Sequence, residues 1–361
     1  MKDAVIVLNF GEPSKPALEE VIPFLERIFL TNANLEAHAT PEERQKRSRE
    51  LAERRAPGLI EAYERIGSSP MNAQANAQAR ALGMELHRRG RRIPVYSAFQ
   101  FTPPLVADMV DKACRDGVTR LVGLPIYPLC GPSTTVAALN EVQRAIDGLA
   151  WDVEYLGISG WHGHPAYLEL RADRIRRLAD ERGVSLDDPE TRLVFSAHGT
   201  PKRYLDEGSR YEEYVKEFCA DIARRLGVAH YELGYQNHAN RNIRWTEPGI
   251  EVVVEQLRAK RIVVDAVSFM HEQSETLAEL DLELKEKAEM TGLEFHRVPI
   301  PHDDPRFARM LADLVDGVLA SETAGVLSLA PCRCRPALGT FCLNAPPDPQ
   351  PRRAAARKAL P

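Results

Sequence analysis

The sequence has no hydrophobic run long enough to span a membrane and little excess charge of either sign. No segment approaches the ~18 consecutive apolar residues that a transmembrane helix needs, and the 361 residues carry a formal net charge of only −5. A balance so close to neutral excludes the strongly basic face that is typical of nucleic-acid binding. The N-terminal apolar run at 4–8 is shorter than a signal-peptide core. We therefore expect a cytoplasmic protein that begins with a β-strand.

Cysteine is sparse except near the C-terminus. The chain has six: Cys114, Cys130, Cys219, Cys332, Cys334 and Cys342. Structural disulfides are not expected in a reducing compartment. The last three lie close together, and such spacing in a non-secreted chain favours metal binding over unligated thiols. Zinc or a [2Fe–2S] cluster would need a fourth ligand, and Cys130 is the first choice because it lies in a loop at the expected sheet edge.

Short apolar segments alternate with helical patterns along most of the chain, which predicts an α/β fold with doubly wound parallel sheets. The expected strands are Ala4–Asn9, Ile93–Phe99, Arg120–Ile126, Val153–Ile158, Arg192–Ser196, His230–Tyr235, Arg261–Val267 and Gly325–Leu329. We expect two similar halves at 1–148 and 149–325, a cysteine-rich extension at 326–344 and a disordered tail at 345–361. Helix Asp304–Ala320 is a candidate to cross back onto the first half.

A histidine stands at the end of one of these strands. His198 follows the apolar run Leu193–Ser196 and precedes Gly199. The carboxyl ends of parallel strands are where open α/β folds bind their ligands, and a neutral imidazole can accept a proton near pH 7. The alternative is a histidine that is merely satisfied in a turn; the strand and the glycine favour a functional one.

A row of carboxylates follows a later strand. Glu275, Glu279 and Glu283 are spaced i, i+4, which places them on one face of a helix. A solvated acidic face is the alternative, but the intervening leucines indicate a packed helix. Such a row suits a divalent cation that moves from solvent to a pocket. We expect His198 and Glu275 to lie on opposite sides of a cleft.

Two further segments are candidates for ligand contact. Ser133, Thr134 and Thr135 stand at a helix start, and capping accounts for one hydroxyl but not for all three. A helix N-terminus of this kind can also hold the carboxylates of an anionic ligand. Phe10, at the exit of the first strand, is equally consistent with a core position and with a place in the cleft.

Five motifs occur in the order found in ferrochelatases, over roughly residues 4–320: LNFGEP, GSSPMN, YPLCGPSTT, FSAHGTP and SFMHEQSETLAELD. The chain therefore resembles this family. The resemblance implies two Rossmann-like halves that enclose a porphyrin cleft. It also implies a lyase that inserts Fe²⁺ into protoporphyrin IX or coproporphyrin III in haem synthesis, with release of two protons.

The resemblance assigns roles to individual residues. His198 resembles the active-site histidine, as proton acceptor or metal ligand, Glu275 resembles its partner carboxylate, and Glu279 and Glu283 resemble an acidic row that leads metal to it. The implied porphyrin contacts are Phe10, Ser133, Thr134, Thr135, Trp161 and Trp245. The apolar segment Ile22–Leu30 resembles a lip that touches a membrane surface. The cysteine tail resembles forms with a [2Fe–2S] cluster, here held by Cys130, Cys332, Cys334 and Cys342.

The chain departs from the family pattern at two positions. Gln273 stands where a histidine is usual, with His271 as a possible substitute, and Gln100 stands where many members have a basic residue. The alternatives to a ferrochelatase are a non-catalytic tetrapyrrole or metal carrier, and a class II cobalt or nickel chelatase. The oligomeric state stays open between monomer and homodimer.

Overall fold

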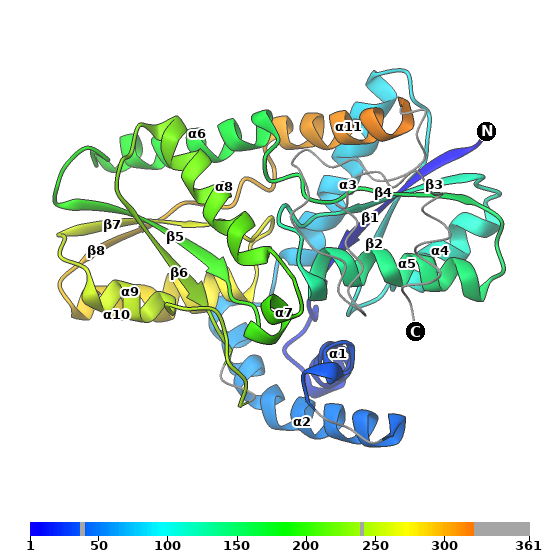
Figure 1. Ribbon diagram of the computed structural model, residues 1–361, viewed down its shortest axis with the longest axis horizontal. Coiled ribbons are helices and arrows are strands. Elements are labelled where there is room, and N and C mark those ends of the chain that lie inside the picture. The colour runs from blue at the N-terminus through cyan, green and yellow to red at the C-terminus, as the bar shows by residue number, and fades with distance from the viewer. Residues whose placement is uncertain (37–39, 239–241, 321–361) are drawn as a thin grey trace.

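The computed structural model describes residues 1–36, 40–238 and 242–320. Two four-stranded parallel sheets lie side by side, and helices cover both faces of each (Figure 1). The strand orders, β2-β1-β3-β4 and β6-β5-β7-β8, repeat one pattern in which the first strand of each half is flanked on both sides. This confirms the expected pair of Rossmann-like halves.

Near-continuous apolar runs form the central strands, as expected where both faces of a parallel sheet are covered. The bounds are β1 Asp3–Asn9, β2 Val95–Phe99, β3 Arg120–Pro125, β4 Glu154–Gly157, β5 Thr191–His198, β6 Tyr231–Gln236, β7 Arg261–Ala266 and β8 Glu294–Arg297. Seven of these match the strands expected from the sequence. The expected strand Gly325–Leu329 lies outside the described residues. The sequence did not predict strand β8, because three of its four residues, Glu294, His296 and Arg297, are polar. The segment is a strand because it pairs with β7.

The expected boundary after residue 148 falls too early. Strand β4 pairs with β3, with Leu121 opposite Tyr155 and Gly123 opposite Gly157. The first sheet therefore extends to Gly157, and the chain passes to the second half afterwards. The position of a boundary depends on which strand pairs with which, and apolar patterning does not carry that information.

Fourteen helical segments are described. The α-helices are α1 Leu18–Thr31, α2 Pro41–Ile66, α3 Met71–Arg88, α4 Val106–Arg115, α5 Ala137–Gly148, α6 Pro165–Arg182, α7 Lys202–Asp206, α8 Tyr211–Leu226, α9 Ile250–Gln256, α10 Lys285–Met290 and α11 Pro305–Ala320. Two π-helices, η2 Pro132–Val136 and η3 Glu275–Leu284, lie at the ends of strand-exit loops, and the 3₁₀-helix η1 spans Ala33–Leu35. None of the described helices is both long and apolar enough to cross a membrane.

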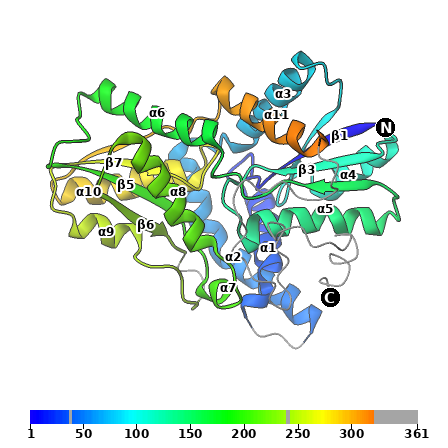
Figure 2. The ribbon, with the colours of Figure 1, turned by 45° about the horizontal axis from the view of Figure 1, so that its top comes forward.

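Helix α11 returns to the first half, as expected. It lies beside α3 in both ribbon views (Figure 2). The guanidinium of Arg89, just after α3, donates to Asp313 at 2.7 Å and to Asp316 at 2.9 Å. The last described helix therefore fastens the second half to the first.

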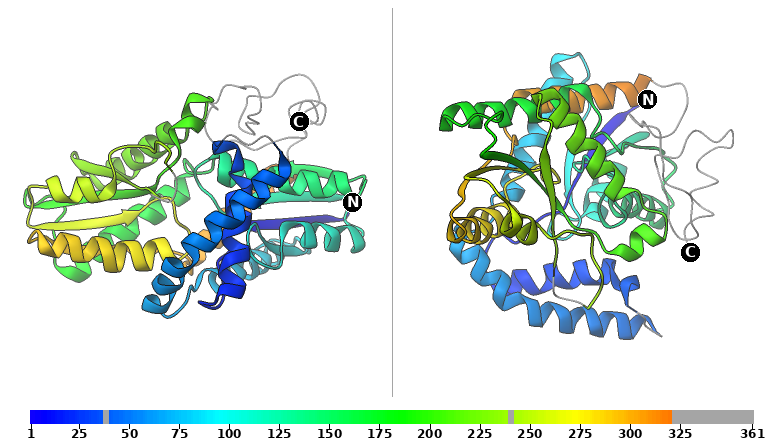
Figure 3. Two further views of the ribbon diagram at one scale, coloured as in Figure 1. Left: turned by 90° about the horizontal axis from the view of Figure 1, so that it is seen from below. Right: turned by 60° about the vertical axis from the view of Figure 1, so that its left-hand side comes forward.

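Helices α1 and α2 form a hairpin that the sequence did not predict as a unit. It is inserted after β1 and runs across the two sheets when the molecule is seen from below (Figure 3). Phe24 and Leu25 of α1 pack with Leu59 and Tyr63 of α2 in a small core of their own. The hairpin thus closes one side of the space between the two halves.

Candidate active site

His198 is the last residue of β5, at the carboxyl edge of the second sheet. Its backbone N–H donates to the Ser268 hydroxyl at 3.0 Å, and its carbonyl accepts from the Tyr211 hydroxyl at 3.0 Å. Its ring Nδ1 lies 2.7 Å from the carbonyl oxygen of Gly199. A carbonyl can only accept, so Nδ1 carries the proton and Nε2 of the neutral ring is bare. Burial, and then the neighbouring His238, lower the pKa of His198 and favour that neutral form.

His238 lies beside His198 and was not singled out from the sequence. It follows β6, whose last residue Gln236 pairs in register with His198. The two Nε2 atoms are 3.1 Å apart. Like His198, His238 stands just past the end of a strand, and this position was the sequence feature that could have revealed it. The feature points to the site only once β5 and β6 are known to be neighbours.

Glu275 begins the π-helix η3 and completes this group. A carboxylate oxygen of Glu275 and one imidazole nitrogen each of His198 and His238 all lie within 4.8 Å of one another. The expectation that His198 and Glu275 face each other across the cleft is therefore wrong. Both belong to the second half, since β5 and β7 are adjacent strands and η3 follows β7.

The carboxylate row runs outward along η3. Glu275 and Glu279 are half-buried and Glu283 is exposed. Burial, and then the charge of Glu275, raise the pKa of Glu279 to about 7. Burial also acts to raise the pKa of Glu275, but the two imidazoles and Gln273 outweigh it and the pKa is lowered. Glu283 makes a 3.4 Å ion pair with Arg65 of α2 at the surface. The row thus connects solvent to the histidines.

Gln236 and Glu12 are two further buried residues at the site that the sequence did not reveal. Gln236 accepts from Ser196 and donates to the Glu275 carbonyl and the Glu279 carboxylate, each at 2.9 Å. Glu12, in the loop after β1, accepts from hydroxyls of Tyr63, Ser69 and Ser274. Burial, and then the charge of Glu275, raise the pKa of Glu12 to about 7. Isolated polar residues of this kind show no spacing pattern in the sequence.

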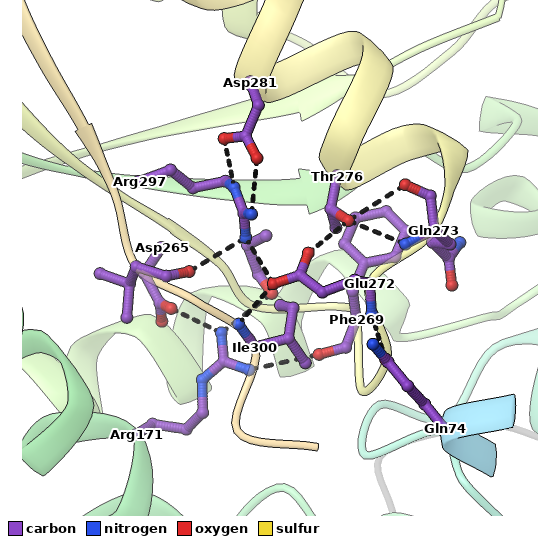
Figure 4. Close-up of polar contacts among 12 residues, drawn as sticks. Gln74, Arg171, Asp265, Phe269, Glu272, Gln273, Thr276, Asp281, Arg297 and Ile300 are labelled. Atoms are coloured by element: carbon purple, nitrogen blue, oxygen red, sulfur yellow. Dashed lines mark hydrogen bonds and ion pairs between the residues drawn. The ribbon is translucent and has the colours of Figure 1, made fainter. Parts of the chain in front are cut away.

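Behind η3, a network of charged side chains holds the helix in place (Figure 4). Arg297 of β8 makes two hydrogen bonds with Asp281 of η3, at 2.6 and 2.7 Å, and one with Glu272 at 3.1 Å. Glu272 also accepts from the Thr276 hydroxyl and from the backbone N–H of Ile300. These contacts fix the beginning and the middle of η3 on the side away from the carboxylate row.

The departures at Gln273 and Gln100 have clear structural outcomes. Gln273 donates to the Glu275 carboxylate at 2.7 Å, so it supports that carboxylate directly. His271 instead contacts Gln78 of α3 at 2.8 Å. Gln100 is buried and accepts from the Tyr127 hydroxyl at 2.8 Å.

A cavity opens between the hairpin and the two halves beside this group. Its wall includes His198, His238, Glu275 and Glu279 on one side and apolar residues of α1 on another. Of the residues implicated as porphyrin contacts, the wall contains Phe10, Ser133, Thr134 and Trp245. Thr135 and Trp161 are fully buried outside it: the Thr135 hydroxyl donates to the Leu129 carbonyl, and the Trp161 Nε1 donates to the Pro125 carbonyl.

Only one of the four cysteines assigned to a cluster can be placed. Cys130 is a buried free thiol at the exit of β3. Within the described residues it forms no group of three metal-ligating side chains. Cys332, Cys334 and Cys342 lie outside the described residues.

Comparisons with known proteins identify the family of this chain. The sequence model of the ferrochelatase family matches residues 2–319. The ferrochelatase of Synechococcus sp. (strain JA-3-3Ab) is 34% identical over 324 residues, which cover 87% of this chain and 93% of that protein. That of Geotalea uraniireducens (strain Rf4) is 31% identical over 333 residues, or 89% and 99% of the two chains.

A solved structure supports the fold independently. SirB from Bacillus subtilis, solved with Fe³⁺, superposes with a TM-score of 0.50 at 12% identity and covers 88% of this chain and 98% of its own. At that identity the likeness concerns the fold alone. The match of the family model over nearly all described residues, together with the two full-length relatives, shows that this chain belongs to the ferrochelatase family.

Proposed function

We propose that this lyase inserts Fe²⁺ into a porphyrin bound in the cavity between the two halves, with His198 and Glu275 as the protein groups nearest the reaction. The observation that carries this proposal is their arrangement. A bare imidazole nitrogen and a carboxylate stand side by side in the wall of one cavity. Metallation needs a base for the pyrrole N–H groups and oxygen or nitrogen ligands for the incoming ion.

His198 is suited to receive one of the two protons that the porphyrin loses. Its Nδ1–H is engaged by the Gly199 carbonyl, so the lone pair of Nε2 is the available acceptor. Because burial lowers its pKa, the ring is neutral near pH 7, so the Nε2 lone pair is not already occupied by a proton. As each pyrrole N–H bond breaks, its electron pair stays on nitrogen and forms the bond to iron, while one proton passes to His198 and the other to water.

Glu275, Glu279 and Glu283 would guide the ion. A second cavity lies on the outer side of η3 and contains Glu279 and Glu283 in its wall. It shares Arg55, His238 and Glu279 with the main cavity. Successive carboxylates allow a cation to exchange water for protein oxygen in steps. The exposed end at Glu283 and the half-buried Glu279 and Glu275 give such a sequence of steps.

The porphyrin would be held by Phe10, Ser133, Thr134 and Trp245. Phe10 packs edge-on against Phe101 at 4.5 Å and against Phe24 at 6.0 Å, so an aromatic surface borders the cavity. Among the residues that the structure describes, the buried Trp245 indole N–H has no hydrogen-bond partner. It is therefore available to a carbonyl or carboxylate of the ligand. The hydroxyls of Ser133 and Thr134 lie at the start of η2 in the same wall.

The proposal is tested by anaerobic metallation. Purified protein is mixed with Fe²⁺ and either protoporphyrin IX or coproporphyrin III, and the loss of free-porphyrin fluorescence is followed beside a His198→Ala variant. We expect turnover with at least one porphyrin, and a loss of at least a hundredfold in kcat in the variant. Tight porphyrin binding without metallation would instead identify a carrier. Turnover only with Co²⁺ or Ni²⁺ would identify another chelatase.

Two finer features of the family resemblance remain proposals. A [2Fe–2S] cluster would be held by Cys130, Cys332, Cys334 and Cys342, and Cys130 suits such a role as a free thiol at a loop. Anaerobically purified protein should then show thiolate-to-iron absorption that Cys334→Ser abolishes; protein without this absorption contradicts the cluster.

The segment Ile22–Leu30 would touch a membrane surface, which co-sedimentation with anionic vesicles checks. Phe24, Leu25 and Phe29 of that segment face inward, whereas Leu30 is exposed.

A further inference from the structure

The contact between His198 and His238 has two chemical interpretations. The Nε2 atoms lie 3.1 Å apart, and Nδ1–H of His198 is held by the Gly199 carbonyl. The His198 Nε2 lone pair therefore points toward His238. Either His238 donates an Nε2–H to that lone pair, or both nitrogens present lone pairs to one cation. A carbonyl that fixes the tautomer of a histidine through its other nitrogen is a regular companion of metal ligation.

The geometry fits ligation of a single ion. Imidazole nitrogens bind divalent transition metals at about 2.0–2.1 Å. Two such ligands at a right angle lie about 3 Å apart, which agrees with the observed 3.1 Å. Glu275 supplies an oxygen within 4.8 Å of both nitrogens. All three side chains are half-buried and line the same cavity.

The elements that carry the three side chains also favour a fixed site. His198 and His238 come from the adjacent ends of β5 and β6, where the Gly199 N–H donates to the Gln236 carbonyl at 2.7 Å. Gln236 in turn donates to the Glu275 carbonyl. One buried residue thus joins the strand that leads to His238 with the helix that carries Glu275. Preorganised ligands of this kind lower the cost of binding an ion.

We propose that His238 is a third protein ligand for the substrate metal, so that His198, His238 and Glu275 hold Fe²⁺ before its transfer. This inference rests on the proposed function and extends it. Two histidines and one carboxylate that leave coordination positions open form a ligand set suited to Fe²⁺. The open positions, on the cavity side, are where pyrrole nitrogens would replace water. A bare His198 nitrogen released by the departing ion is then free to accept a proton.

The test measures metal binding without porphyrin, using Co²⁺ as a spectroscopic probe. Wild type, His238→Gln and the control His87→Gln are titrated by calorimetry and visible absorption. Glutamine keeps an N–H donor at position 238 but is a poor metal ligand. His87 is exposed near the end of α3 and is not among the residues that line the two cavities. We expect His238→Gln to weaken Co²⁺ binding at least tenfold and to change its d–d spectrum, and the control to match wild type.

An unchanged affinity and spectrum in His238→Gln would overturn the proposal and leave a hydrogen bond as the role of His238. Wild-type protein that metallates porphyrin but binds no Co²⁺ would overturn it as well. A further measurement needs no variant: electron spin echo modulation of Cu²⁺ bound to wild type counts the coordinated imidazoles. Two coordinated imidazoles would support the proposal, and a single one would contradict it. Failure of the proposed function is a separate result: protein with this metal site that metallates no porphyrin.

Discussion

At the scale of single residues, His162 shows what burial does to an imidazole outside the site. It is 3% exposed and packs against Tyr214 and Phe218. Burial lowers its pKa from 6.5 to about 4. Between these values the unfolded chain binds a proton that the folded protein does not. The contribution of this group to stability is therefore complete above pH 6.5 and is lost as the pH falls toward 4.

We predict that His162→Phe makes the protein less sensitive to acid. The loss in free energy of unfolding between pH 7.5 and 4.5 should be smaller than in wild type, by about 3 kcal/mol at most. Denaturant titrations at the two pH values measure this, with the exposed His87→Gln as control. Equal acid sensitivity in wild type and His162→Phe would show that His162 does not titrate in this way.

The reacting residues could be found from the sequence only where a local pattern marked them. His198 was predicted because a histidine and a glycine follow a buried strand, and Glu275 because three glutamates share a spacing of four. His238, Gln236 and Glu12 are single polar residues in separate segments. What makes them part of the site is the pairing of β5 with β6 and the approach of the β1 loop to η3. Neither is encoded in a short stretch of sequence.

At the scale of elements, the site depends on how closely β5 and β6 approach each other at their ends. A Cβ added to Gly199 would lie 2.9 Å from the Gln236 carbonyl oxygen and would also collide with the Asn237 side chain. The ends of β5 and β6 can accommodate this added methyl group only by moving apart. Such overpacking typically costs about 1–3 kcal/mol.

We therefore predict that Gly199→Ala separates His198 from His238 and impairs metallation more than stability. Porphyrin metallation should fall at least tenfold, while the free energy of unfolding drops by about 1–3 kcal/mol. The control is Gly163→Ala, because no atom of the described part of the chain lies within 4 Å of a Cβ at that position. Full activity in Gly199→Ala would show that the strand ends tolerate the change and that the contact between the imidazoles is not required.

The π-helix depends on the charged network behind it. Arg297 is 8% exposed and neutralises both Asp281 and Glu272. Arg297→Leu would leave these carboxylates without their cation, and breaking a partly buried pair in this way costs about 3 kcal/mol or more. Arg297→Lys keeps the charge but loses the two-pronged contact with Asp281, so a smaller loss is expected. Urea denaturation distinguishes the variants, and a leucine variant as stable as wild type would refute the account.

The spacing of the three glutamates predicted a helix but could not by itself predict its form. The i, i+4 spacing of the glutamates is compatible with an α-helix and with the wider turn of a π-helix, since four residues make close to one turn in both. Tertiary contacts decide which of the two helices forms. Asp281 is tied to β8 and Glu272 to the loop before α11, so the helix is adjusted to partners that lie 16 and 28 residues away.

At the scale of the whole molecule, the two halves were predictable because each repeats the same alternation of strands and helices. The hairpin α1–α2 was not, since its apolar stripe could equally face a membrane, a ligand or the rest of the protein. In the structure much of that stripe faces its own partner helix and the cavity. The molecule thus has three parts that must be held in register around one cavity.

Glu12 is the residue that joins all three parts. It follows β1 of the first half, accepts from Tyr63 of the hairpin at 3.0 Å, and accepts from the Ser274 hydroxyl and backbone N–H of the second half at 2.5 and 3.2 Å. Glu12 is 3% exposed. Removing it leaves several buried donors without an acceptor, and each such group costs about 1–3 kcal/mol.

We predict that Glu12→Ala lowers the free energy of unfolding by about 3–5 kcal/mol and weakens porphyrin binding at least tenfold, because the cavity wall is built from all three parts. Glu12→Gln keeps one acceptor oxygen but turns an amide N–H₂ toward other donors, so an intermediate loss is expected. Denaturant titration and porphyrin fluorescence quenching measure the two effects, with the exposed Glu64→Gln as control. If Glu12→Ala lost stability but kept wild-type porphyrin affinity, Glu12 would stabilise only its own loop and not the arrangement of the three parts. The two halves would then have to be held in register by other contacts, such as those of helix α11 with Arg89.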